Sequence, residues 1–386
     1  MLDAVPPFAN HLPVRIRFGD GVVGELAGAL AAERARRPFC VVDPAVAELE
    51  PVRAALAAVD GAVVVWSTAP GEPTVASVEA AADALAGAAA DAVVAIGGGS
   101  TIDTAKAARL VAGQGLAYRE IAAGRVAVAA PAVALVAVPT TAGTGSEVSG
   151  GAVIADERTG RKAGIASPLL RAQHALVDPE LTHGLPPAPT LHGGVDALAQ
   201  AIAAIVVTCR TPVGDALALE AVRLAAGALP AVVADGADRA ARSRLSCASL
   251  LAGLAMNVSD CGSEHALGQA LGGRLHLPHG LAVALVLAES LEHDRPAAAA
   301  QLERVADALD APAEGPGDGS RAVTAVRALL AQLGVPTLAS VGGAGLVLDA
   351  LADDALADPF LRVAPVPWTR EDVLAAYRAA LVLDRR

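Results

Sequence analysis

The sequence predicts an α/β domain with a largely parallel sheet, followed by an all-α domain. Its 386 residues exceed what one hydrophobic core usually holds, which indicates two domains. In the first half, short valine-rich runs alternate with alanine-rich stretches of helical length, and from Pro186 onward the strand signals mostly disappear. We place the domains at residues 1–181 and 182–386, because the prolines and glycines of residues 178–193 oppose both helix and sheet.

The individual elements follow from the same pattern. Valine-rich runs bounded by Gly, Pro or Asp predict strands over residues 39–42, 62–66, 92–96 and 135–138. Stretches with few helix breakers predict helices over residues 52–58, 75–86 and 102–110, and in the second half over residues 195–205, 212–226 and 240–256. Glycines and prolines in residues 311–321 predict an exposed connection within the helical domain.

Composition favours a small molecule as the partner. The net charge is −12 and aromatic residues make up 2%, so the chain has neither a basic stripe for nucleic acid or membrane nor a stacking platform. The four cysteines lack CxxC spacing, which is typical of reduced thiols rather than disulfides. Arg125 and Pro131 interrupt the most apolar window, and we see no secretory signal. We therefore expect a cytoplasmic protein that binds no nucleic acid and no membrane.

The sharpest motif is IGGGSTIDTAK, in which a buried strand leads into Gly97, Gly98, Gly99 and Ser100 and then into a helix from about Ile102. Three glycines let the backbone turn tightly and approach a ligand, and a helix N-terminus favours a phosphate. A glycine-rich turn without a ligand is the alternative, since the string is not the GxGxxG fingerprint.

A second polar loop, PTTAGTGSEVSGG, follows the next predicted strand. It supplies Thr140, Thr141, Thr144 and Ser146, whose hydroxyls can donate to phosphate or ribose oxygens. Two such loops at the carboxyl ends of neighbouring parallel strands form the crevice where open α/β sheets bind nucleotides. The two loops together predict a dinucleotide site.

Three charged residues bear on this site. Asp43 ends a predicted strand, where a carboxylate can accept from an adenosine ribose and repel a 2′-phosphate, which favours NAD over NADP; a turn or helix cap before Pro44 is the alternative. Only two of the 29 basic residues are lysine, Lys106 and Lys162. A compact ammonium at these positions suggests a geometric need, such as contacting a ribose or phosphate or supporting the glycine loop, although chance also explains it.

The helical half carries a possible metal site. Asp196 and Gln200 share one helical face, as do His265 and Gln269, and His276 and His279 follow in a loop. Aspartate and histidine converging from separate elements suit a divalent cation such as Fe²⁺ or Zn²⁺. The alternative is that the aspartate is an ordinary ion-pair partner and the histidines are satisfied polar residues.

These motifs, with ALVDPELTHGLPPAPT before GGVDALAQAIAA and EHALGQALGG before LPHG, resemble the iron-containing alcohol dehydrogenases over roughly residues 14–290. The resemblance implies the dehydroquinate synthase-like fold, with a Rossmann-like NAD(P)-binding domain before an all-α domain that holds the metal. For the dinucleotide it implies Asp43, Gly98, Gly99, Ser100, Thr140, Thr141, Thr144 and Lys162, to which the motifs add Gly97, Asp103 and Ser146. For the metal it implies Asp196, His265 and His279, with Gln200 at the fourth position.

Three residues depart from the family pattern. Gln200 stands where the family has a histidine ligand, Gln269 where it has a second helical histidine, and Ala203 where it has a carboxylate. An amide oxygen holds a borderline cation more weakly than an imidazole does, so a labile metal or an empty site is credible. Without a metal, His265 and His279 would polarise the substrate oxygen or take the alcohol proton.

The resemblance implies reversible hydride transfer between a nicotinamide and a small alcohol, aldehyde or ketone at the cleft between the domains, with His265, His279 and Asp196 as catalytic residues. The enzyme could be a specialised biosynthetic dehydrogenase. Two alternatives are a sugar-phosphate cyclase of the dehydroquinate synthase kind and a non-catalytic dinucleotide-binding relative. We also expect at least a homodimer.

Overall fold

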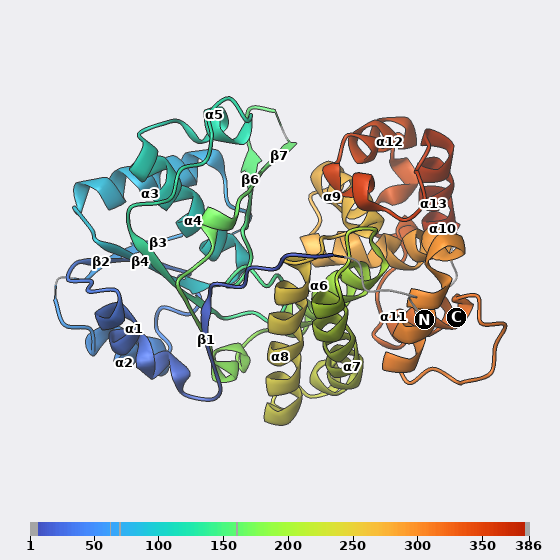
Figure 1. The fold of residues 1–386 in the computed structure, drawn as a ribbon, viewed down its shortest axis with the longest axis horizontal. Coiled ribbons are helices and arrows are strands. Elements are labelled where there is room, and N and C mark those ends of the chain that lie inside the picture. Colours follow the sequence, from blue (N-terminus) through green and yellow to red (C-terminus); the bar gives the residue numbers. More distant parts are fainter. Residues whose placement is uncertain (1–6, 62, 69–70, 160, 383–386) are drawn as a thin grey trace. The chain divides into compact units, whose positions relative to one another are not determined.

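The computed structural model describes residues 7–61, 63–68, 71–159 and 161–382. They form two compact units, an α/β unit of residues 12–185 and a helical unit of residues 186–382 with residues 7–11. Figure 1 shows the strands confined to the α/β unit. The predicted fold class, a Rossmann-like domain followed by an all-α domain, is confirmed.

The α/β unit is built on a parallel sheet of six strands in the order β1-β8-β5-β4-β2-β3. The strands are β1 (Arg15–Phe18), β2 (Pro38–Val42), β3 (Val64–Ser67), β4 (Ala92–Gly97), β5 (Ala134–Pro139) and β8 (His174–Val177). The predicted strands correspond to β2, β3, β4 and β5, although residue 62 lies outside the described residues. Strands β1 and β8 were not predicted.

Helices cover both faces of this sheet, as a parallel sheet requires. They are α1 (Leu26–Ala32), α2 (Glu50–Ala57), α3 (Val75–Gly87), α4 (Gly99–Gln114) and α5 (Tyr118–Ala122). Alternate residues of one strand face opposite layers. Cys40 and Val42 of β2 pack in the core that includes Leu26 of α1, whereas Phe39 and Val41 pack in the core that includes Ile102 of α4.

An antiparallel hairpin, β6 (Gly151–Asp156) and β7 (Arg161–Ala166), follows the second polar loop and was not predicted. Its buried residues Ala152 and Ile154 pack with Val75, Val78 and Tyr118 in a separate core. The hairpin therefore packs against α3, α4 and α5 instead of extending the main sheet.

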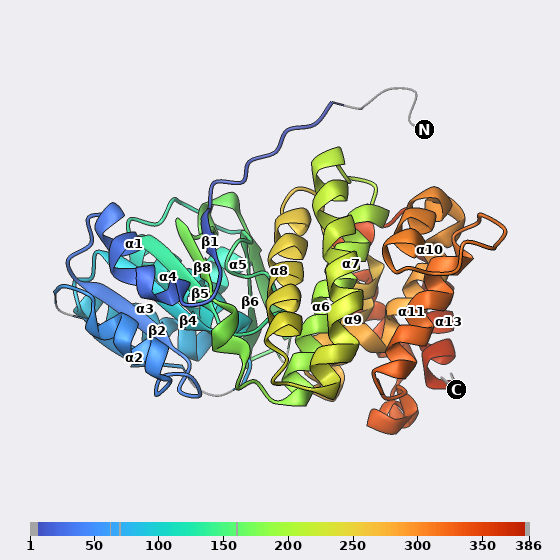
Figure 2. The same cartoon turned by 90° about the horizontal axis from the view of Figure 1, so that it is seen from below.

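The helical unit consists of long packed helices. They are α6 (Pro187–Val206), α7 (Pro212–Ala234), α8 (Arg239–Met256), α9 (Ser263–Leu275), α10 (His279–Ala308), α11 (Ser320–Gln332), α12 (Leu348–Leu356) and α13 (Arg370–Val382). Helix α6 contacts α7, α8 and α10, and Figure 2 shows α6, α7 and α8 side by side. Residues 194–206 of α6 are buried on every side, so α6 is the central helix of this unit.

The prediction that residues 178–193 oppose helix formation is wrong for the last part of the segment. Helix α6 begins at Pro187, and Pro189 lies in its first turn. Proline costs little there because the first N–H groups of a helix have no partner within the helix. Ahead of it, Pro179 starts a short 3-10 turn, Pro179–Thr182.

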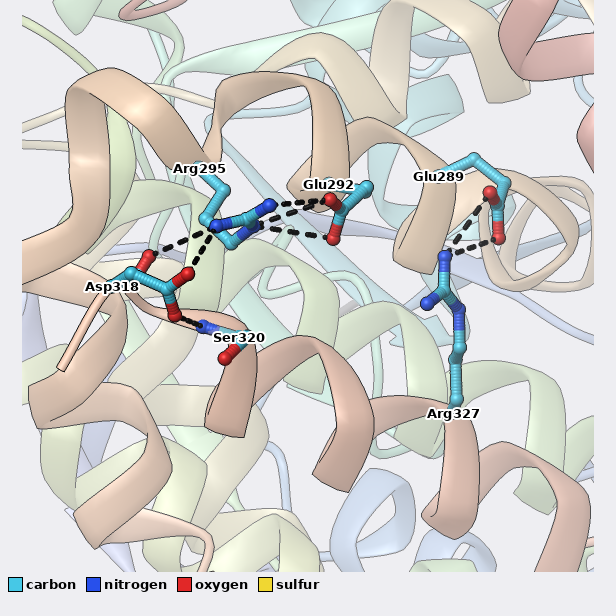
Figure 3. A network of polar contacts seen from close by, with 6 residues as sticks. All are labelled: Glu289, Glu292, Arg295, Asp318, Ser320 and Arg327. Atoms are coloured by element: carbon cyan, nitrogen blue, oxygen red, sulfur yellow. Dashed lines mark hydrogen bonds and ion pairs between the residues drawn. The ribbon is translucent and has the colours of Figure 1, made fainter. Parts of the chain in front are cut away.

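The predicted loop over residues 311–321 connects α10 to α11, although its last two residues already belong to α11. Arg295 of α10 donates to Glu292 on its own helix and to Asp318 of the loop, both at 2.8 Å (Figure 3). Arg327 of α11 donates to Glu289 of α10 at 3.2 Å. These ion pairs fasten the exposed loop and α11 to α10.

Helix α7 is long and apolar enough to cross a membrane by length and composition, and 39% of its most apolar window is buried. A core helix of a soluble protein passes the same test. The four cysteines are free thiols.

Candidate active site

The glycine motif forms a tight turn between β4 and α4. Strand β4 ends at Gly97, and α4 begins at Gly99, three residues before the predicted start. A Cβ at Gly97 would lie 2.5 Å from the Thr101 hydroxyl and 2.9 Å from the Asp43 Cβ, so no larger side chain fits. Gly99 and Ser100 therefore lie in the first helical turn, where amides have no partner within the helix and suit an anion.

The structure brings the second polar loop against this turn. Thr140 follows β5, and its backbone amide donates to the Gly97 carbonyl at 3.0 Å. A Cβ at Gly98 would lie 3.1 Å from the Thr141 methyl carbon, and one at Gly99 would lie 2.7 Å from that of Thr144. The two loops are thus in van der Waals contact at the carboxyl ends of neighbouring strands, as the sequence predicted.

Two of the residues predicted to bind the dinucleotide, Asp103 and Ser146, make contacts within the protein. The Ser146 hydroxyl donates to Asp103 at 2.7 Å, and the Val153 amide donates to the other Asp103 oxygen at 2.9 Å. The Asp103 carboxylate thus fastens the second loop and β6 to α4. These contacts explain both residues without a ligand, and their contact with a dinucleotide stays a prediction.

Lys106 supports the fold and is not available to a ligand. Its ammonium is fully buried and donates to the Ser149 hydroxyl at 3.1 Å and the Gly151 carbonyl at 2.8 Å. Burial lowers the pKa of Lys106 to about 8, although Asp103 and Glu147 oppose the shift. Of the roles considered for this lysine, internal support is what the structure shows, although the supported segment is the second loop and not the glycine loop. Contact with a ribose or phosphate stays a prediction.

Asp43 and Lys162 also lie in the α/β unit. The Asp43 amide donates to the Ile96 carbonyl, which places this residue beside the glycine turn, and its carboxylate accepts from the Ala45 amide at 2.9 Å. Lys162 of β7 donates to Glu72 at 2.6 Å. Asp43 is therefore both the turn former and a neighbour of the predicted dinucleotide site.

The helical unit brings three predicted metal ligands together. Asp196 of α6, His265 of α9 and His279 of α10 each offer a ligand atom within 4.8 Å of the others. Asp196 Oδ1 is 3.4 Å from His265 Nε2 and 3.6 Å from His279 Nε2. Asp196 and His265 are buried, whereas 32% of the His279 side chain is exposed.

The close approach of α10 to α6 sets this arrangement. A Cβ at Gly280 would lie 2.0 Å from the His192 carbonyl oxygen and 3.1 Å from the Asp196 Cβ. Only glycine allows the two helices to meet at this level, which explains the glycine that follows His279. The string LPHG therefore fixes the position of His279 as well as supplying it.

Gln200 lies one turn after Asp196 and donates its amide to Asp196 Oδ2 at 3.1 Å. It thereby orients the carboxylate. Gln269 lies half-buried one turn after His265, and Ala203 is buried in α6. His276 is exposed at the left-handed residue that ends α9, with φ of 52°, and is not part of the cluster.

Sequence reasoning missed Glu264, whose Oε1 lies 2.6 Å from His265 Nδ1. Burial lowers the pKa of His265, but Cys261, Asp196 and Glu264 outweigh burial and raise it well above its ordinary value. The sequence shows only a glutamate directly before a histidine, and it does not show which way the glutamate side chain turns.

Comparison with known protein families identifies the family of this chain. A model described as "Iron-containing alcohol dehydrogenase" matches residues 13–179. A second, described as "Fe-containing alcohol dehydrogenase family, C-terminal", matches residues 190–381. The chain belongs to the iron-containing alcohol dehydrogenase family. It is an oxidoreductase that acts on alcohols or carbonyl compounds with NAD(P). The family match favours this function over that of a sugar-phosphate cyclase.

Individual relatives of this alcohol dehydrogenase match most of the chain. Probable alcohol dehydrogenase EutG of Escherichia coli is 36% identical over 83% of this chain and 80% of its own length. Alcohol dehydrogenase 4 of Saccharomyces cerevisiae is 32% identical over 96% and 97%. The structure of a sulfoacetaldehyde reductase from Bifidobacterium kashiwanohense in complex with NAD⁺ has a TM-score of 0.90 and 29% identity, covering 98% and 100%.

We predict that Gly99→Ala weakens NAD binding by at least about tenfold, a loss of about 1.4 kcal/mol. The new Cβ would press on Thr144, 2.7 Å away, and force the two loops apart. Titration of intrinsic or NADH fluorescence measures the affinity. Gly113→Ala on the same helix is the matched control, because its nearest neighbour would be 3.8 Å away. Equal affinities for the two variants would contradict the prediction.

We predict that Lys106→Met destabilises the protein by about 3–5 kcal/mol, because it leaves the Asp103 carboxylate, which is only 14% exposed, without the ammonium 3.9 Å away. Urea denaturation measures the free energy of unfolding. Lys162→Met is the control: its partner Glu72 is 48% exposed, so the loss should stay within about 1 kcal/mol. A Lys106→Met protein as stable as the control would show that the buried ammonium does not hold the loop.

Proposed function

We propose that this chain is an NAD-dependent alcohol dehydrogenase in which Asp196, His265 and His279 hold a divalent cation, Fe²⁺ or Zn²⁺. The observation that carries the proposal is the convergence of these three side chains from α6, α9 and α10. The Gly97–Ser100 turn and the Thr140–Ser146 loop hold the dinucleotide. The reaction is a reversible hydride transfer between the nicotinamide and the carbon that bears the substrate oxygen.

The residues of the cluster fit a cation. Ligand atoms around a tetrahedral cation with bonds of about 2.1 Å lie about 3.4 Å apart. The two Asp196–histidine separations are 3.4 Å and 3.6 Å. The buried Nε2 of His265 also has no hydrogen-bond partner among the residues that the structure describes, which a bound cation would supply.

Three protein ligands with a further open position are typical of a catalytic rather than a structural metal site. When bound, the cation lowers the pKa of the substrate alcohol as a Lewis acid. Asp196 and His265 hold the buried side of the site, and Gln200 orients the Asp196 carboxylate. His279 forms the exposed side, so we infer that the substrate oxygen approaches beside it.

We infer that Asp43 selects NAD. It lies beside the glycine turn, where its carboxylate can accept from the adenosine ribose and repel a 2′-phosphate. The related sulfoacetaldehyde reductase from Bifidobacterium kashiwanohense has a structure in complex with NAD⁺, which agrees with this preference. We further infer a cytoplasmic homo-oligomer, at least a dimer, that acts on a small alcohol or carbonyl compound.

Turnover tests the proposal directly. Purified protein with NAD⁺ and a panel of small alcohols, with Fe²⁺ or Zn²⁺ added or removed by a chelator, should form NADH, seen as absorbance of the reduced nicotinamide. Net NADH formation separates the dehydrogenase from the cyclase, which uses NAD only transiently. Dinucleotide binding without any turnover would instead identify a non-catalytic relative.

Asp196→Ala should abolish cation binding and lower kcat/KM by at least about a thousandfold, or about 4 kcal/mol, because it removes the ligand that both histidines face. Metal analysis and steady-state kinetics measure the two effects. NAD affinity should remain at the wild-type value, since the variant lies in the other unit. Retained activity in the metal-free variant would mean that the imidazoles alone suffice.

Asp43→Asn should raise the preference for NADP over NAD by roughly tenfold, or about 1.4 kcal/mol. The amide oxygen keeps an acceptor for the Ala45 amide, so the turn survives while the charge that repels a 2′-phosphate is lost. The ratio of kcat/KM values for the two cofactors is the measurement. An unchanged ratio would assign Asp43 to the turn alone.

A further inference from the structure

A buried carboxylate lies directly behind one of the proposed metal ligands. Glu264 is the second residue of α9 and is 2% exposed. Its Oε1 lies 2.6 Å from His265 Nδ1 and accepts from the Gly262 amide at 3.1 Å. The opposite ring nitrogen, Nε2, faces Asp196. The imidazole is thus held between two carboxylates.

The backbone around Glu264 is shaped for this contact. A Cβ at Gly262 would lie 2.7 Å from Glu264 Oε2, so a side chain there would displace the carboxylate. The start of α9 is fixed by Ser263, whose hydroxyl donates to the buried Asp294 of α10 at 2.6 Å. Asp294 also accepts from the Trp368 indole at 3.0 Å. Packing and hydrogen bonds therefore hold Glu264 in place.

We propose that Glu264 is a positioning residue for the cation, an inference that rests on the proposed metal site. An ionised carboxylate only accepts hydrogen bonds, so Nδ1 of His265 keeps its proton, and Nε2, which faces Asp196, is the nitrogen that would give up its proton to bind a cation. Carboxylates that accept from a ligand histidine fix its orientation and raise its basicity.

The Glu264 carboxylate also compensates for the cation affinity that is lost because Gln200 stands in place of a histidine. With Gln200 in place of a histidine, the ligand shell loses a strong nitrogen donor, and Gln200 is engaged with Asp196 Oδ2. A second negative charge next to His265 strengthens the electrostatic attraction of a buried site for a divalent cation. Glu264 therefore retains cation affinity that the glutamine would otherwise forfeit.

The test measures Zn²⁺ affinity by competition with a chromophoric chelator in the full-length protein. We expect Glu264→Ala to weaken Zn²⁺ binding by about 10- to 100-fold. Glu264→Gln keeps an acceptor for the Nδ1 proton and loses the charge, so its affinity should lie between those of Glu264→Ala and the wild type. The visible spectrum of the Co²⁺-loaded protein should change in Glu264→Ala, because the orientation of His265 is no longer fixed.

Glu289→Gln is the matched control. Glu289 is a buried carboxylate on α10, the helix that carries His279, but it pairs with Arg327 (Figure 3). Its loss should leave Zn²⁺ affinity and the Co²⁺ spectrum unchanged. Thermal unfolding and NAD titration of every variant verify that both units are folded, and Glu264→Gln, which preserves side-chain volume, serves if Glu264→Ala does not fold.

Two outcomes are distinguishable. If the wild-type protein binds no Zn²⁺, Co²⁺ or Fe²⁺, the metal part of the proposed function is wrong, and the role of Glu264 falls with it. If the wild type binds Zn²⁺, and the folded Glu264→Ala and Glu264→Gln variants bind it as tightly as the wild type does, the proposed metal site stands. The inference about Glu264 is then overturned.

Discussion

The α/β unit depends on the lack of a side chain at three consecutive glycines. At Gly97, Gly98 and Gly99 the backbone lies so close to Thr101, Thr141 and Thr144 that a Cβ would contact them at 2.5–3.1 Å. This contact locks the end of β4 to the loop that follows β5, and it sets the first turn of α4 at the edge of the sheet. The first amides of α4, which the helix itself leaves unbonded, are thereby held where we propose that a phosphate of the dinucleotide binds.

The helical unit applies the same principle to a different chemistry. Gly280 lets α10 touch α6, so that ligands from three helices converge, and Gly262 leaves room for the Glu264 carboxylate behind His265. In both places a glycine lets two backbone segments approach closely, and this approach brings charged side chains together. Buried polar groups of this kind are stable only when each is oriented by a partner, which Gln200 and Glu264 supply.

The sequence predicted β2, β4 and β5 because they are buried on both faces and read as continuous apolar runs, and it predicted the edge strand β3 from its valines. It failed for β1, whose RIRF run is charged and exposed, and for β8, whose buried HALV run is short and contains a histidine. It also failed for the β6–β7 hairpin, whose pairing depends on tertiary packing. The convergence of Asp196, His265 and His279 was predictable from motif order. The contact of Glu264 with His265 was not predictable, because it depends on which way the Glu264 side chain turns. The pairing of Asp103 with Lys106 was not predictable either, because it forms inside the fold.

His279 is the one partly exposed member of the three-residue cluster, with Asp196 and His265 buried beneath it. A cation exchanging with the surroundings would pass this imidazole, and rotation of that single side chain would open the coordination sphere. The ions available in the cell would then determine which ion is bound, because the ion could be replaced after the protein has folded. Protein prepared from iron-rich cultures and from zinc-rich cultures would accordingly differ in metal content but have the same structure.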